Sequence, residues 1–356
     1  SLSLPSMRVN TLTAEMASVI SRVRKTGFTI APEAGTQRLR NVINKGISDA
    51  DILQTVEEAF TAGWDLLKLY FMIGLPTETD EDIEGLIDLV FRLQKHAQHL
   101  SKKYASKKRG FQKATLHVGI SSFVPKAHTP FQWEPLTSRA QLKSIQRLLQ
   151  QRIRHRAIQL KWHPVEASYL EGVFARGDRR LGRVLAEAHQ LGCKLDGWSE
   201  YFDFSKWLKA FEYVGIHPDF YVHRERDEHE KFPWDHIQTG VSRTYLWHER
   251  VKGLHAESSP ACDPDCRRCG LCHDEIGVQI VNAGGREPKA DVLARPIARA
   301  KVLRVRAAYS KTGWLRFLSH LDLGRVFQRA IARINAPIAY SQGFHPHPHI
   351  AFGPAL

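Results

Sequence analysis

The chain has 356 residues, of which 43% are hydrophobic and 25% charged, a composition typical of globular proteins rather than disordered or fibrous ones. No apolar run approaches the roughly 20 residues of a membrane-spanning helix, and no signal-peptide pattern opens the sequence. The net charge of +14 comes from 51 Lys and Arg against 37 Asp and Glu. We therefore expect a cytoplasmic protein with no membrane partner.

The first 165 residues alternate strand and helix patterns. Strands are predicted at residues 2–9, 27–31, 66–73 and 115–124, and helices at residues 14–23, 37–44, 48–63, from Thr79 onward, and 138–156. Such repeated β-α units predict a parallel α/β sheet whose ligand lies at the carboxyl ends of the strands. An open sheet and a closed or partial barrel both fit this pattern.

Two local features support these predictions. Ser48, followed three residues later by Asp51, predicts a capping box at the start of a helix. The run 66–73 is apolar except for Lys68, which predicts a strand covered on both faces.

The second half of the sequence is less regular. Residues 181–191 and 204–214 predict helices, and Cys193 is expected to be a small buried residue. Residues 256–285 are rich in Ser, Pro, Asp, Cys and Gly and predict a metal-bearing linker. A β-type run at 301–309 begins a separate small domain. We therefore divide the chain into residues 1–165, 166–290 and 297–356.

Four cysteines, Cys262, Cys266, Cys269 and Cys272, lie within eleven residues. Zinc usually takes two separated pairs of thiolates, whereas serial Cys-x2-Cys spacing is typical of iron–sulfur proteins. The cluster therefore predicts an auxiliary iron–sulfur cluster or a zinc site, with free or redox-active thiols as the remaining alternative.

Basic residues are concentrated in three stretches. Residues 295–356 carry ten Lys and Arg against the single acid Asp322, while residues 136–165 and 101–113 carry seven and six with no acid. A polyanion such as RNA is the partner that this balance favours. A merely solvated basic surface is the alternative.

Polar and glycine residues follow three successive predicted strands. Glu33 and Gly35 lie at the first tip, Gly74, Leu75 and Pro76 at the second, and residues 123–130 follow the third. A carboxylate at a strand tip can hold an ammonium or ribose hydroxyl, and a glycine lets a flat ring approach the backbone. Three such motifs in register predict one ligand site.

These motifs carry a family resemblance. Residues 31–40 (APEAGTQRLR), 68–78 (KLYFMIGLPTE) and 122–126 (SFVPK) resemble the radical S-adenosylmethionine (SAM) superfamily, in the branch shared with methylthiotransferases and oxygen-independent coproporphyrinogen oxidases. Together with residues 309–313, 317–322 and 340–346, the pattern is most similar to an uncharacterised fusion family. That family joins a cobalamin-binding-like domain, a radical SAM barrel and a C-terminal domain of unknown function.

The resemblance implies the C-terminal part of a partial (β/α)6 TIM-like barrel, from about its third strand onward, then a helical metal-binding region and the start of a small α+β domain. It implies SAM and a [4Fe–4S] cluster as cofactors, with cobalamin as a further option in the intact protein. Glu33 would contact the ribose or amino group of SAM, and Arg38 its carboxylate. Residues 74–76 would flank the adenine, on which Val124 would pack.

The family's Cys-x3-Cys-x2-Cys loop lies upstream of these motifs, and residues 1–165 contain no cysteine. We therefore expect a piece of a radical SAM enzyme that needs a preceding part of the same protein and is inactive alone. Its substrate is unknown, with an RNA base as the leading hypothesis. The alternative is a non-catalytic RNA-binding module with a structural zinc site.

Overall fold

The computed structural model describes residues 27–105, 114–262, 266, 268–271, 305–341 and 347–352. Its contacts divide the chain into two compact units, Ser1–Ile280 and Val281–Leu356. The finer division into three segments stays a prediction. None of the helices in the described ranges is long and apolar enough to cross a bilayer.

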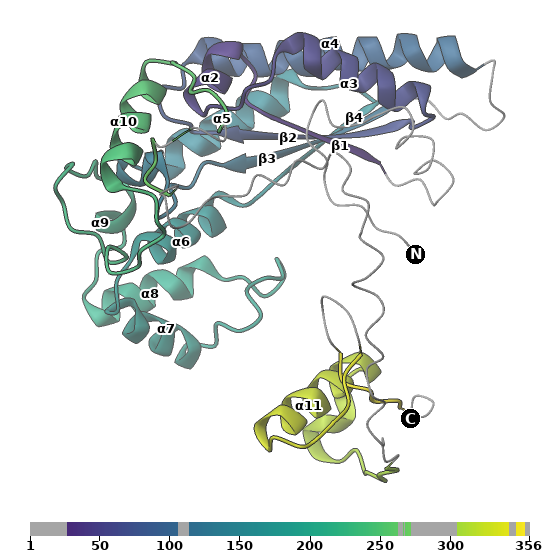
Figure 1. The fold of residues 1–356 in the computed structure, drawn as a ribbon, viewed down its shortest axis with the longest axis vertical. Helices are drawn as coiled ribbons and strands as arrows, with labels where there is room; N and C mark the ends of the chain where they lie inside the picture. Colours follow the sequence, from purple (N-terminus) through teal and green to yellow (C-terminus); the bar gives the residue numbers. More distant parts are fainter. Residues whose placement is uncertain are drawn as a thin grey trace. The chain divides into compact units, whose positions relative to one another are not determined.

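A four-stranded parallel sheet forms the centre of the first unit (Figure 1). Its strands β1 (Phe28–Glu33), β2 (Leu66–Ile73), β3 (Thr115–Ser122) and β4 (Ile158–Trp162) lie in chain order. The connections contain helices α2 (Gln37–Val42), α3 (Asp49–Thr61), α4 (Asp80–Ala105) and α5 (Arg139–Arg152). A doubly wound sheet reverses its strand order, whereas a barrel keeps it. The fold is thus α/β, consistent with a partial TIM-like barrel.

The sheet buries one face. Leu69 and Phe71 of β2 are buried in the apolar core shared with α3, α4 and α5, whereas Lys68 is only half-buried and Tyr70 is 48% exposed. The prediction that this strand is covered on both faces is therefore wrong for the described residues. The prediction relied on composition. Leu66, Tyr70 and Met72 make the run apolar, but they do not face the helices.

Strand β4 is absent from the sequence-based assignment. The helix predicted through Arg156 ends at Arg152, and β4 follows after a short connection. Ile158 and Leu160 pack against the core, whereas Lys161 is exposed. A five-residue alternation next to a basic helix is too short to stand out from the helical pattern.

The capping box at Ser48 is confirmed. The Asp51 N–H donates to Ser48 Oγ at 3.1 Å, and the Ser48 N–H donates to Asp51 Oδ2 at 2.8 Å. The helix that begins there places Val56 and Phe60 in the core, where both are fully buried.

A helical layer follows the sheet. It contains α6 (Val165–Arg176), α7 (Leu181–Gln190), α8 (Phe204–Val214) and α9 (Asp219–Val222), which share a second apolar core. The helices predicted at 181–191 and 204–214 are confirmed, and Cys193 is buried in this core. The described part of the unit also contains the 3-10 helix η1 (Pro130–Trp133) and α10 (Arg243–Leu254).

The described part of the second unit consists of the 3-10 helix η3 (Gly313–Phe317), helix α11 (His320–Arg333) and an isolated antiparallel bridge between Tyr340 and Pro348. The strand predicted at 301–309 is not formed by residues 305–309, and residues 301–304 lie outside the described ranges. The elements predicted at 2–9 and 14–23, and most of the linker at 256–285, also lie outside them.

Candidate functional site

The carboxyl end of β1 carries Glu33 in a left-handed conformation, with φ of 67°. Ile30 pairs with Leu69 and Glu33 pairs with Phe71, so β1 carries one extra residue between these pairs. Such an irregularity redirects the end of a strand. The Glu33 carboxylate accepts a hydrogen bond from Lys45 Nζ at 3.1 Å, and 25% of its side chain stays exposed. It is therefore a paired but accessible carboxylate.

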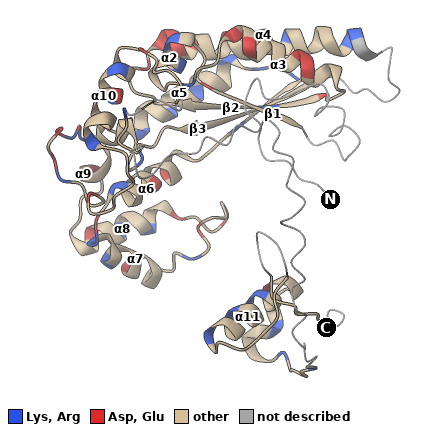
Figure 2. Ribbon diagram, viewed as in Figure 1, with Lys and Arg blue, Asp and Glu red and all other residues tan. Residues whose placement is uncertain are grey.

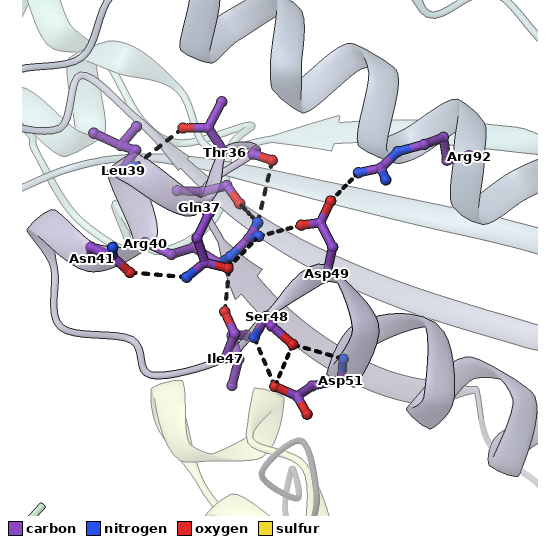
Figure 3. Close-up of polar contacts among 12 residues, drawn as sticks. Thr36, Gln37, Leu39, Arg40, Asn41, Ile47, Ser48, Asp49, Asp51 and Arg92 are labelled. Atoms are coloured by element: carbon purple, nitrogen blue, oxygen red, sulfur yellow. Dashed lines mark hydrogen bonds and ion pairs between the residues drawn. The ribbon is translucent and has the colours of Figure 1, made fainter. Parts of the chain in front are cut away.

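Arg40 holds the turn that follows Glu33 through polar contacts (Figure 3). Its side chain is fully buried. Its guanidinium donates to the carbonyl oxygens of Ala34, Gly35 and Ile47 at 3.1 to 3.3 Å and forms an ion pair with Asp49. Sequence analysis missed this role, because a buried Arg on a short helix has no distinctive pattern.

Asp49 also pairs with Arg92 of α4 (Figure 3). Burial acts to raise the pKa of Asp49, but the hydrogen bonds from Arg92 and Arg40 outweigh it and hold that pKa below its ordinary value. The ionised carboxylate thus links α2, α3 and α4 behind the strand tip.

Gly35 is needed for packing. A Cβ at this position would overlap the backbone of Leu86 in α4. The contact explains a glycine at this turn without any ligand, and its contact with a cofactor stays a prediction.

Arg38 spans from α2 to the loop after β2. It donates to the Thr77 carbonyl at 2.8 Å and to the Thr77 hydroxyl at 3.2 Å, and it forms an ion pair with Asp82. Its side chain is 42% exposed. The guanidinium is therefore oriented by the protein and still open to an anionic group.

The loop after β2 begins at Gly74, which lies at the same edge of the sheet as Glu33. Gly74 has a φ of 75°, and a Cβ there would lie 2.8 Å from Leu142 Cδ2 and 3.0 Å from Thr137 Oγ1. Its carbonyl oxygen accepts a hydrogen bond from the Thr137 hydroxyl at 3.2 Å. Backbone conformation and close packing both require glycine here.

Glu78 closes this loop on itself. Its Oε1 accepts a hydrogen bond from the Gly74 N–H at 2.7 Å. Burial raises the pKa of Glu78 to about 7, although hydrogen bonds from Gly74 and Leu75 act in the opposite direction. Sequence analysis quoted Glu78 within a motif but gave it no role.

Leu75 and Pro76 of this loop are buried. Leu75 belongs to an apolar cluster with Ala34, Leu39 and Phe131 that joins the ends of β1 and β2. Any contact of this loop with an adenine ring would therefore involve mainly its backbone.

A cavity of about 520 Å³ opens at the ends of β2 and β3. Of the predicted site residues, Val124 lines it. Ser122 also lines it, and its hydroxyl is buried with no hydrogen-bond partner among the residues that the structure describes. Glu249 and Gly253 bring α10 to the cavity from more than 100 residues away in the sequence, which no local pattern could reveal.

Three of the four clustered cysteines lie within the described residues, and Cys272 lies outside them. The carbonyl oxygen of Cys269 accepts a hydrogen bond from the Ser242 N–H at 2.8 Å, which ties the segment to the start of α10. The described residues contain no group of three or more metal-ligating side chains. The metal site therefore stays a prediction.

Comparison with known proteins adds the family. Residues 1–90 match the radical SAM superfamily. About the first quarter of the chain is thus similar to that superfamily. Residues 304–356 match an uncharacterized protein family conserved in bacteria, DUF2344, so the recognised combination of a radical SAM segment with a C-terminal domain of unknown function is confirmed.

A curated relative matches a longer stretch of the chain. An uncharacterized protein of Methanocaldococcus jannaschii is 30% identical over 217 residues, which are 60% of this chain and 44% of that protein. The chain thus matches less than half of that relative.

Proposed function

We propose that this chain is part of a radical SAM enzyme and binds SAM at the carboxyl ends of β1 and β2. The observation that carries the proposal is the placement of an accessible carboxylate, Glu33, and an accessible guanidinium, Arg38, beside the Gly74 loop at one edge of a parallel sheet. Ligands of α/β folds bind at this edge, and the radical SAM match includes all three residues.

The charges of Glu33 and Arg38 are complementary to those of SAM. A carboxylate can accept hydrogen bonds from the ammonium group or the ribose hydroxyls, and a guanidinium can bind the methionine carboxylate. Arg38 is held by Thr77 and Asp82, so it is oriented before the ligand arrives, which lowers the entropy cost of binding.

The iron–sulfur cluster of the family does not fit residues 1–165, because thiolates are its ordinary ligands and this segment has no cysteine. When bound elsewhere in the intact protein, the cluster supplies the electron that cleaves SAM. The residues described above would bind and orient SAM but could not reduce it. We therefore expect this polypeptide to bind SAM without cleaving it.

Equilibrium dialysis with radiolabelled SAM tests the proposal. Glu33→Gln and Arg38→Met are each expected to weaken binding about ten-fold or more, since each removes a charge-assisted hydrogen bond. The matched controls Glu212→Gln and Arg183→Met change exposed residues of α8 and α7 and should leave binding unchanged. Wild-type chain that does not retain SAM would refute the proposal, as would equal losses in the controls.

The second unit supports RNA as the substrate or partner. Arg306, Arg316, Arg325, Arg329 and Arg333 are all exposed, and Figure 2 shows basic residues along α11. The basic stretch at 136–165 is less available, because Lys143 pairs with Glu166 and Arg152 with Glu84. Contacts with several successive RNA phosphates are therefore expected mainly through the second unit.

A further inference from the structure

We propose that the sheet face opposite α3, α4 and α5 binds the phosphate of a nucleotide, either free or within a single-stranded nucleic acid. We call this surface, made by Lys68, Tyr70, His117 and Lys161, the basic face. The inference rests on the proposed function, since it names the class of substrate that the first unit would bind.

The strand register brings these residues together. Lys68 pairs with His117, Tyr70 pairs with Gly119, and Gly119 pairs with Lys161. Paired residues and residues two apart share one side of a sheet, and strands lie about 4.8 Å apart with about 6.6 Å between alternate residues. The three basic residues therefore start from backbone positions within roughly 13 Å of one another.

The charges of Lys68 and Lys161 also act on His117. Burial lowers the pKa of His117, and the positive charges of Lys161 and Lys68 lower it further. Lys68 and Lys161 are thus the two cations of the basic face, and the lowered pKa of His117 favours its neutral imidazole between them.

The two lysines of the basic face differ from other lysines of the first unit in their ion pairs. Lys45, Lys126 and Lys143 each pair with a glutamate, whereas neither lysine of the basic face has a carboxylate partner within the described part of the chain. Holding like charges together costs free energy that a bound anion offsets.

An aromatic ring completes the surface. Tyr70 lies across the backbone at Gly119, where a Cβ would come within 2.9 Å of the ring. Because Tyr70 is 48% exposed, the ring remains accessible for stacking. A stacking ring beside unpaired cations is the arrangement that binds a base together with its phosphate.

The cavity at the strand ends is a poor competitor for phosphate. Its lining includes Glu171, Glu249 and Glu257 against the single lysine Lys126, so its charge opposes an anion. The basic face and the cavity thus select opposite charges within one unit.

Calorimetric titration with adenosine 5′-monophosphate at low salt tests the inference. Lys68→Met and Lys161→Met are each expected to weaken binding about five-fold or more, because each removes a cation that can hydrogen-bond phosphate. The matched control Lys209→Met, an exposed lysine of α8, makes the same change in net charge and should have no effect.

Three results would overturn the inference: no binding by wild-type chain, equal binding of adenosine, or an equal loss in the Lys209 control. Tyr70→Leu should weaken binding of the nucleotide but not binding of inorganic pyrophosphate. An equal effect on the two affinities would exclude stacking of the base on Tyr70. A single-stranded oligoadenylate that binds over ten-fold tighter than the mononucleotide identifies nucleic acid as the source, and equal affinity identifies a free nucleotide. No SAM is present, so failure of SAM binding leaves this result intact.

Discussion

Replacing Glu78 by glutamine tests the architecture of the loop that is proposed to meet the adenine. Its carboxyl has an ordinary pKa of 4.5, which burial raises to about 7 in the folded chain. The folded state therefore binds more protons than the unfolded state between these values, and the free energy of unfolding falls as the pH rises through them. At 1.36 kcal/mol per pH unit, the full loss is about 3 kcal/mol.

Glutamine keeps the oxygen that accepts from Gly74 but does not titrate. The variant's unfolding free energy, minus that of wild type, is thus expected to increase by about 2 to 3 kcal/mol between pH 5 and pH 8. Taking the difference cancels the other titrating groups. Urea unfolding followed by tryptophan fluorescence measures it in the first unit, because every tryptophan except Trp314 lies there.

Glu212→Gln, on the exposed side of α8, is the control, and its difference from wild type should stay flat over the same range. A flat difference for Glu78→Gln as well would show that this carboxyl does not lie buried against the loop. The packing argument for residues 74–78 would then be wrong.

Three further predictions concern other parts of the chain. Gly74→Ala should lower the unfolding free energy more than Gly215→Ala, by about 1 to 3 kcal/mol, because both glycines have positive φ but only Gly74 has neighbours that a Cβ would crowd; equal losses would contradict this. The double variant Arg316→Glu, Arg329→Glu should weaken RNA binding for all sequences and reduce the slope of log affinity against log salt by about 0.7 per lost phosphate contact. An unchanged slope, measured by filter binding, would show that the second unit does not bind RNA through these arginines. Anaerobic reconstitution should load iron and sulfide, or one zinc, at the cysteine cluster of residues 262–272, and folded protein that takes up no metal would disprove the site.

Local patterns predicted much of the first unit correctly. The capping box at Ser48 and the helices α7 and α8 depend on neighbours within a few residues, so their signals are complete in short windows. Strand β4 was missed because its alternation covers five residues. Strand β2 was predicted with the bounds that the structure shows, but its composition did not reveal that the helices cover one of its faces.

The candidate site divides in the same way. Glu33 and Gly74 could be placed at one edge because parallel strands end together. The burial of Arg40 and the titration of Glu78 depend on packing between α2, α3, α4 and the loop after β2. The approach of α10 to the cavity depends on contacts across more than 100 residues, so a sequence pattern could not contain it.

Hydrogen exchange measured by mass spectrometry, with and without SAM, tests the central claim most directly. The account predicts slower exchange in peptides that cover residues 33–40 and 74–80, at the carboxyl ends of β1 and β2, and weaker protection around Val124. Peptides from α7 and α8 should be unchanged. Protection confined to those helices, or no protection at saturating SAM, would contradict the assignment of this sheet edge as the SAM site.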